Sequence, residues 1–418
     1  MCGLSAFALL NSTDTAIVAP LGTDAVAALG LASAVWLLTY GSVYGALSPI
    51  SIAVARAHAG QDLRAIDRIL RAGLLLGAAM GMVAAVVVIL LYPAMPWLGQ
   101  PDELLAMVFG YWITLALSQI PMGLLEMTRE TYAAIDRPWT GVALGNVAVV
   151  LNVPLSIVLV HGGLGLPALG LLGAGIGTLA AMMVGVIVAL AKLRRDGLLP
   201  GGTPLQDILA EARRLLLPCL GAGVQYLAEA SAFSGGMLLI GLLGPVPLAA
   251  SQIVLSVATL VYMLPLGIAV AAGLRLAGAL GADETTRLRP IAVTTLLGTS
   301  LWMGITALVF VLGGSAFAGW FSDDPAVLVL AAQLFGLVAL MQLADGLQSV
   351  AVGGLRGLND VRVPTIATVV GYWVLSLPIG WGLAFPLDLG AAGIWIGFFI
   401  GLSVAAAVLV PRLLARTG

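Results

Sequence analysis

Apolar stretches long enough to cross a lipid bilayer follow one another along almost the whole chain. A membrane-spanning helix needs about 20 mainly apolar residues. We count twelve such stretches, at residues 2–19, 29–56, 72–93, 104–131, 139–160, 170–192, 216–243, 248–273, 290–314, 326–354, 363–386 and 391–410. The chain is 61% hydrophobic and 9% charged, whereas soluble domains carry roughly 25% charged residues. The pattern predicts an all-α polytopic membrane protein with twelve transmembrane helices.

The charged residues test that count independently. All 18 Lys and Arg residues gather in six segments, at residues 56–71, 129–137, 192–214, 275–289, 356–362 and 412–416. The alternate loops contain acidic residues and no basic ones. Because loops rich in Lys and Arg stay in the cytoplasm, we expect both termini to be cytoplasmic.

The two halves of the chain repeat one another. The stretch "LGTDAVAALGLASAVW" aligns with "LGPVPLAASQIVLSVA" at a shift of 222 residues, which puts Tyr40 and Tyr262 in one register. At the same shift, the first span should begin a few residues before Met1. Two six-span repeats with an even number of spans run parallel, as in many secondary transporters, whose binding sites lie near mid-membrane.

The longest polar connection separates the two halves and ends in the amphipathic sequence "LQDILAEARRLL". Such a sequence is typical of a helix lying on the membrane surface. We therefore expect an N-terminal six-helix lobe at 1–192, a cytoplasmic linker with an amphipathic helix at 193–215, and a C-terminal six-helix lobe at 216–418.

Three acidic residues fall inside the predicted spans. At 1.5 Å per residue, Asp345 and Glu229 lie near mid-membrane, and Asp14 lies closer to the outer surface. Gln342 and Gln348 flank Asp345 at three residues on either side, so all three share one helical face. An acid in hydrocarbon is costly and generally marks an ion or substrate pathway. We predict that the three acids couple cation binding to transport; the alternative is a structural role for each.

Other intramembrane polar residues have simpler explanations. Glu126 and Arg129 are one helical turn apart, and we interpret them as a structural ion pair. Asn146 and Asn152 either hold helices together or bind substrate. The motif "GIGTLA" at 175–180 fits a dinucleotide fingerprint, but no predicted strand precedes it. Close helix packing explains its glycines better.

Several chemistries lack the residues they need. The two cysteines, Cys2 and Cys219, are too few for a disulfide framework. The chain has two histidines, His58 and His161, and both lie at the ends of spans. It therefore lacks the residues for a zinc site or a Ser-His-Asp catalytic triad. The sequence contains no phosphate-binding P-loop and no basic run. We expect a protein that is not an enzyme, with no cofactor and no nucleic-acid partner.

Three longer strings carry a family resemblance. They are "STDTAIVAPLG", "AASQIVLSVATLVYMLPLGIAVAAGLRLAGALG" and "RGLNDVRVPTIATVVGYWVLSLPIGWGLAF" followed by "GAAGIWIGFFIGL". They resemble the first span, the eighth span and spans 10–12 of the multidrug and toxic compound extrusion (MATE) family, in its NorM-like branch. The resemblance implies twelve helices in two six-helix lobes. It also implies a monomer of the bacterial inner membrane that exports small cationic amphiphilic compounds in exchange for H⁺ or Na⁺.

The resemblance also assigns roles to individual residues. In NorM-like members a glutamate of span 7 and an aspartate of span 10 form the cation site, and the matching residues are Glu229 and Asp345, where Na⁺ would bind. The span-1 aspartate of the family matches Asp14. Two departures favour H⁺ over Na⁺. Ser256 stands where many members have an asparagine that helps to bind Na⁺, and Met341 replaces a tyrosine one turn before the aspartate.

Further polar and aromatic residues are expected to line the substrate cavity. They are Asn11, Gln119, Asn146, Asn152, Gln225, Ser256, Gln342, Gln348 and Tyr372. An alternative within transport is a lipid-linked oligosaccharide or lipid flippase of the wider superfamily. Its pyrophosphate cargo would require several cationic residues in the cavity, and only Arg129 is a candidate. A membrane enzyme or a receptor fits less well, because neither needs parallel six-helix repeats.

Overall fold

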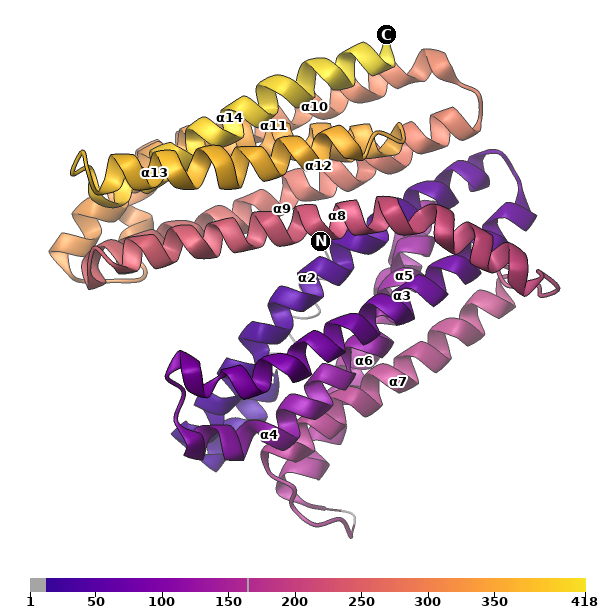
Figure 1. Cartoon of the computed structure of the whole chain (residues 1–418), viewed down its shortest axis with the longest axis horizontal. Coiled ribbons are helices and arrows are strands. Elements are labelled where there is room, and N and C mark those ends of the chain that lie inside the picture. Colours follow the sequence, from indigo (N-terminus) through magenta and orange to yellow (C-terminus); the bar gives the residue numbers. More distant parts are fainter. Residues whose placement is uncertain (1–12, 164) are drawn as a thin grey trace. The chain divides into compact units, whose positions relative to one another are not determined.

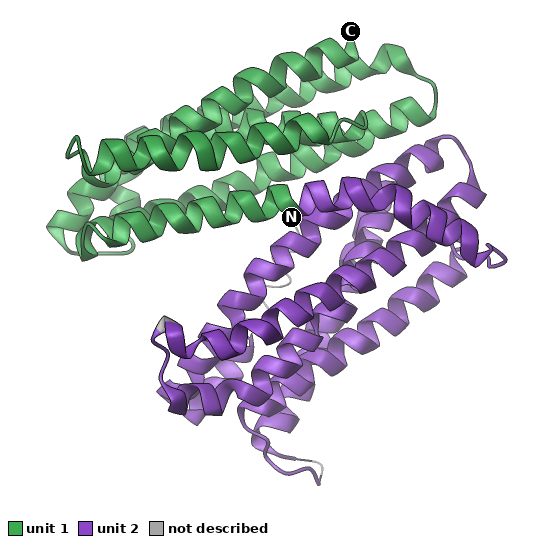
Figure 2. Cartoon of the chain, in the orientation of Figure 1, with its two compact units in different colours: residues 1, 224–418 green, residues 2–223 purple. Residues whose placement is uncertain are grey.

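The computed structural model describes residues 13–163 and 165–418, and in these ranges every named element is helical. One isolated antiparallel bridge, between Gly163 and Leu166, is the exception to helix, turn and coil there. The chain divides into two compact units, residues 2–223 and residues 224–418 (Figure 2). We refer to them as the N-terminal and C-terminal units and describe each by itself.

The N-terminal unit begins with a helical segment at residues 13–18. Its other elements, in chain order, are η1 (Ala19–Leu21), α2 (Thr23–Ala59), α3 (Leu63–Leu91), η2 (Tyr92–Ala94), η3 (Pro96–Leu98), α4 (Asp102–Leu117), α5 (Gln119–Ala134), α6 (Pro138–His161), α7 (Leu171–Arg195) and the first part of α8 (Leu205–Gly241). Within this unit α5 packs against α2, α3 and α6, and α7 packs against α4 and α6.

The C-terminal unit contains the rest of α8 and all later elements. These are α9 (Pro245–Gly281), η4 (Thr285–Arg287), α10 (Leu288–Gly319), α11 (Pro325–Gly357), α12 (Arg362–Val369), the π-helix η5 (Val370–Ser376), α13 (Leu377–Ala384) and α14 (Gly390–Thr417). The central helix is α11, which packs against α9, α10 and α14. α12, η5 and α13 follow one another as one rod beside α14 (Figure 1).

Helix starts follow local chemistry. Asp62 and Asp324 accept hydrogen bonds from the backbone N–H groups of Ala65 and Ala326, both at 2.9 Å, and so cap α3 and α11. α6, α9 and α11 begin with proline, whose missing N–H costs nothing in the first turn.

The predicted repeat is visible in the helix bounds. α2 and α9 each have 37 residues and are offset by 222, from Thr23 to Pro245. Residues with left-handed backbone recur at matching turns: Gly22 with Gly244, and Gln61 with Asp283. A further pair is Asp136 and Asn359, with φ of 59° and 64°. The two halves therefore share turn geometry as well as helix lengths.

The structure confirms the all-helical fold class, with small differences in the predicted segments. Among the described residues, ten helices are long and apolar enough to cross a membrane. α8, which carries Gln225 and Glu229 in its apolar part, is not one of the ten. The predicted surface helix of the 193–215 linker is not a separate element, because α8 runs without a break from Leu205 to Gly241.

Candidate functional site

Glu229 on α8 and Asp345 on α11 come together in the C-terminal unit. Asp345 is 6% exposed, and the two carboxyl groups are close enough to interact electrostatically. Gln342 and Gln348 are both buried. The helical face that these two residues were predicted to share with Asp345 therefore points into the protein interior. Across residues 13–163 and 165–418, Oδ1 of Asp345 and both side-chain polar atoms of Gln342 have no hydrogen-bond partner. Buried polar atoms normally have hydrogen-bond partners, and these three atoms could supply oxygen and nitrogen contacts to a ligand.

Close helix packing places Asp345. A Cβ atom on Gly353 would lie 2.1 Å from the carbonyl oxygen of Ala269, and one on Gly357 would lie 2.4 Å from that of Gly273. Glycine at these two positions lets α11 approach the backbone of α9. Small residues allow this kind of contact between membrane helices.

Two tyrosines lie beside the acid pair. Tyr262 on α9 interacts electrostatically with both Asp345 and Glu229, and its hydroxyl is hydrogen-bonded to Ser349. Tyr372 lies on η5 and is fully buried; its hydroxyl is near Asp345 but completes no hydrogen bond with the described residues. Its ring packs edge-on against Phe233, with centroids 5.6 Å apart.

The π-helix η5 carries Tyr372 toward the pair. Ser376 donates a hydrogen bond to the carbonyl oxygen of Gly371, five residues earlier, at 2.9 Å. Trp373 donates to the carbonyl oxygen of Ala228 at 3.0 Å, next to Glu229. π-helical segments occur often at functional sites. Through Trp373 and Tyr372, η5 connects the eleventh span to α8 and to Asp345 on α11.

Arg356 is a member of the cluster that the sequence pattern did not predict. It was counted among the loop cations, but its side chain is buried, and it donates a hydrogen bond to Oε1 of Gln225 at 2.9 Å. It also interacts electrostatically with Glu229. The signal was its position four turns after Gln342, on the half of α11 in which Asp345 and Gln348 are also buried.

Asp14 lies in a separate cluster in the N-terminal unit. It is 1% exposed; Thr178 donates to its Oδ2 at 3.0 Å and Ser156 to its Oδ1 at 3.5 Å. Asn152 in turn donates to Thr178 at 2.9 Å. Gly177 leaves room for Ser156, because a Cβ there would lie 2.6 Å from the serine Oγ. The "GIGTLA" glycines thus serve helix packing, as predicted, and they also make space beside Asp14.

Glu126, Arg129 and Glu130 form a third group on α5, in which both glutamates are buried and Arg129 is partly exposed. Nε of Arg129 donates to both carboxyl oxygens of Glu126, at 2.9 and 3.1 Å, and one terminal nitrogen donates to Glu130 at 2.9 Å. The guanidinium also lies over the ring of Tyr44, 5.4 Å from its centroid. These contacts of Arg129 are all made within the protein, as expected for a structural ion pair.

The family model described as MatE matches residues 2–158 and 222–381 of the chain. The chain belongs to this family. A probable multidrug resistance protein NorM of Bradyrhizobium diazoefficiens is 35% identical, over 97% of this chain and 89% of the relative. The multidrug resistance protein NorM of Burkholderia vietnamiensis is 33% identical, over 98% and 90%. The chain is thus a NorM-like MATE protein that crosses the membrane several times.

Solved structures show the same fold. A crystal structure of a MATE protein in a bent conformation has a TM-score of 0.87 at 20% identity, covering 100% of this chain and 93% of the other. The eukaryotic MATE transporter AtDTX14 has a TM-score of 0.84 at 18% identity, covering 100% and 96%.

The other cavity residues predicted for this MATE protein have varied surroundings. Gln119 is buried and donates to the carbonyl oxygen of Trp36 at 3.2 Å. Asn146 is exposed. Ser256 is also exposed, and its hydroxyl donates to the backbone oxygen of Gln252 at 2.8 Å. Asn11 lies outside the described residues.

A metal centre built from several strong ligands is not found in the part of the MATE chain that the structure describes: no three His, Cys, Asp or Glu side chains come together there. The Glu229–Asp345 pair offers two carboxylates with Gln and Tyr oxygens nearby. Oxygen ligands suit hard cations, and Na⁺ binding at this pair remains a prediction.

Proposed function

We propose that this chain is a secondary antiporter that exports cationic amphiphilic compounds in exchange for H⁺ or Na⁺ by alternating access. The observation that carries the proposal is the pair formed by half-buried Glu229 and buried Asp345, in which Oδ1 of Asp345 lacks a hydrogen-bond partner among the described residues. A carboxylate in such a place favours neutralisation by a proton or a cation. The names of the NorM relatives support multidrug compounds as the exported class.

The charges around the pair indicate how much positive charge it can take. Glu229 and Asp345 are two carboxylates, and Arg356 is the guanidinium that interacts with Glu229. Two negative charges and one positive charge leave a single negative charge when both acids are ionised. One proton, one Na⁺ or one monocationic compound would therefore neutralise the site. Competition between the coupling ion and the exported cation for one charge is sufficient for exchange.

The repetition of one helix pattern in the two halves of the chain supports alternating access, since transporters built from repeats move the repeats about a central site. Asp14 provides a carboxylate in the other unit, and its partners include the hydroxyl groups of Thr178 and Ser156 and the side-chain amide of Asn152. We propose that it is a second coupling residue, because these neutral partners leave its charge uncompensated.

The flippase alternative is less well supported. A pyrophosphate cargo needs cationic side chains that are free to bind it. Arg129 is engaged by Glu126 and Glu130. Arg356 is buried beside Glu229 and Gln225. The positive charges of Arg129 and Arg356 are thus already balanced by neighbouring glutamates and are not available to bind a pyrophosphate.

Transport by the purified protein in liposomes tests the proposal. A fluorescent monovalent cation is placed on one side, and a pH gradient or a Na⁺ gradient is imposed separately. We expect counter-flow of the dye driven by one of the two gradients and none in liposomes without protein. If neither gradient moves the dye, secondary antiport is refuted.

A further inference from the structure

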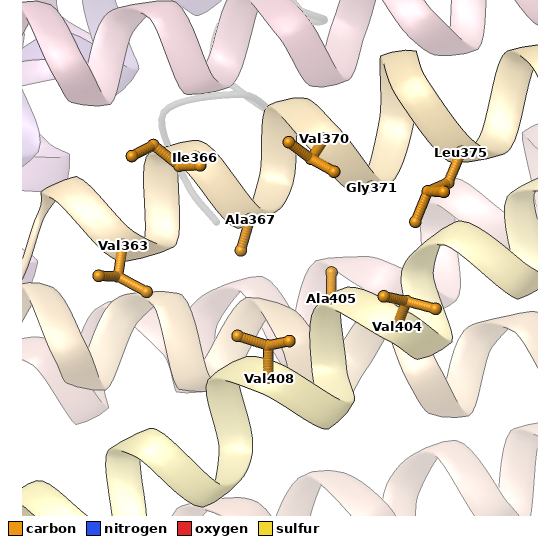
Figure 3. A pocket seen from close by; sticks show the side chains of 9 residues that line it. All are labelled: Val363, Ile366, Ala367, Val370, Gly371, Leu375, Val404, Ala405 and Val408. Carbon is orange, nitrogen blue, oxygen red and sulfur yellow. The ribbon is translucent and has the colours of Figure 1, made fainter.

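An apolar groove lies in the C-terminal unit, between α12–η5 and α14 (Figure 3). Its cavity measures ≈ 230 Å³ and is lined by aliphatic side chains and one glycine. The lining residues are Val363, Ile366, Ala367, Val370, Gly371, Leu375, Val404, Ala405 and Val408. Side chains from the two helices point toward the space between them in Figure 3.

Small residues create the groove. Ala367 and Gly371 on one side and Ala405 on the other leave a gap that their neighbours do not fill. A Cβ atom on Gly371 would lie 3.1 Å from the backbone oxygen of Gly401, so the helices touch at that point and separate beside it. The groove belongs to two membrane-spanning segments, and Val408 is 48% exposed.

Arginines stand at one end of the groove. Arg362 lies four residues before Ile366, and Arg412 lies four residues after Val408, so each shares a helical face with a lining residue. Arg412 is paired with Asp360 at 2.7 Å, and Arg416 lies 3.7 Å from the same carboxylate. Arg362 is exposed and has no ion pair with the described residues. Three arginines and one aspartate leave this end positively charged.

We propose that the groove binds an anionic phospholipid, with an acyl chain between α12–η5 and α14 and the headgroup phosphate at Arg362 and Arg412. The cavity is smaller than the roughly 300–1,000 Å³ of pockets for drug-sized ligands. Its lining also offers no polar side chain to orient such a ligand, so a slender alkyl chain fits it better. Basic pockets between membrane helices on the cytoplasmic side bind anionic headgroups, and all three arginines lie in segments predicted to be cytoplasmic.

The site is separate from the carboxylate pair and does not depend on the transport proposal. The two still share an element, because η5 supplies Val370, Gly371 and Leu375 to the groove and Tyr372 to the acid cluster. A lipid in the groove would therefore contact the outer face of the same π-helix that positions Tyr372.

Native mass spectrometry of the full chain tests the proposal. The protein, purified in detergent, is titrated with phosphatidylglycerol or with phosphatidylcholine of identical acyl chains. We expect tighter binding of phosphatidylglycerol. Arg362→Gln should weaken that binding about fivefold, as expected for the loss of one arginine near an anionic lipid, and should leave phosphatidylcholine binding unchanged. Val408→Trp, which fills the groove, should weaken the binding of both lipids.

Matched variants serve as controls. Val374→Trp places the same ring on an η5 residue that is 58% exposed and does not line the groove. Arg64→Gln removes an exposed arginine of the other unit. Both should bind phosphatidylglycerol like the wild type. The proposal would be overturned if the wild type and Arg362→Gln each bound phosphatidylglycerol and phosphatidylcholine equally tightly. Displacement of phosphatidylglycerol by millimolar inorganic phosphate would also overturn it. Arg362→Gln keeps the test valid if Val408→Trp does not fold.

Discussion

Asp345 and Glu229 can be changed without removing a packed side chain, because Asn and Gln keep the shape of the carboxyl group. Asp345→Asn and Glu229→Gln remove the charge that a coupling ion and a cationic compound would share. We expect each variant to reach the membrane at the wild-type level and to lose efflux down to that of cells without the protein. Accumulation of a fluorescent cation in intact cells measures this.

Asp323→Asn is the matched control for these variants. Asp323 is exposed in the loop before α11, so its neutralisation should leave efflux unchanged. Wild-type efflux by both Asp345→Asn and Glu229→Gln would show that the pair does not couple transport.

Asp196, just past the end of α7, shows how pH should act on stability outside the membrane spans. A hydrogen bond from Lys192, at 2.6 Å, holds the pKa of Asp196 below its ordinary value, and Tyr132 donates a second at 2.8 Å. A lowered pKa in the folded state stabilises the protein above the unfolded pKa of about 3.9. This contribution is lost as pH falls through the lower folded pKa.

Asp196→Asn should therefore destabilise the protein at neutral pH by no more than about 1 kcal/mol, since the pair is partly solvated. Thermal unfolding in detergent should show a constant difference from wild type between pH 8 and pH 5, shrinking below about pH 4. A difference that grows on acidification would contradict the assignment.

At the residue level, spacing along one helix was a sufficient guide for some residues and not for others. Gln342, Asp345 and Gln348 were placed on one face by their three-residue spacing, and all three are buried. Arg356 was assigned to a loop because basic residues usually mark membrane edges. It points inward because Gln225 and Glu229, more than a hundred residues away, supply partners for it.

At the level of elements, the approach of α11 to α9 is the contact most sensitive to size. Gly353→Ala places a Cβ atom 2.1 Å from the backbone of Ala269. The two helices must then separate, and we expect a loss of about 1–3 kcal/mol, typical of overpacking. Gly336→Ala is the control on the same helix, because a Cβ there meets nothing within 4 Å.

The measurement is the apparent melting temperature of the purified variants in one detergent. Gly336→Ala should be as stable as wild type or slightly more so, since alanine favours helix over glycine. Equal melting temperatures for Gly353→Ala and Gly336→Ala would mean that the close approach of α9 and α11 has little energetic weight.

The two repeats differ in where their helices are interrupted, and the sequence analysis did not predict these differences. The fourth span breaks at Ser118 between α4 and α5, whereas the matching α11 is continuous. The fifth span is the single helix α6, whereas the eleventh contains the π-helix η5. A π-turn widens one turn of an otherwise apolar helix. Its place is set by tertiary contacts such as the hydrogen bond from Trp373 to Ala228.

At the scale of the whole molecule, the distribution of basic residues predicts the orientation in the membrane. Green fluorescent protein fused after Gly418 should fluoresce, and alkaline phosphatase at the same point should be inactive, because the former folds in the cytoplasm and the latter outside it. Fusions after Asp323, in a loop without basic residues, should show the opposite pattern. Active phosphatase after Gly418 would contradict the positive-inside assignment.

The order of apolar and charged segments was enough to establish a multi-spanning helical protein with an internal repeat. Span length and charge placement are local properties of the chain, so they can be read from consecutive residues. Which of the polar side chains within the spans meet was decided by tertiary packing. Glu229, Tyr262, Asp345 and Tyr372 come from four different elements, α8, α9, α11 and η5. Their meeting depends on glycine contacts and on a π-turn, and both arise from long-range contacts that no local pattern records.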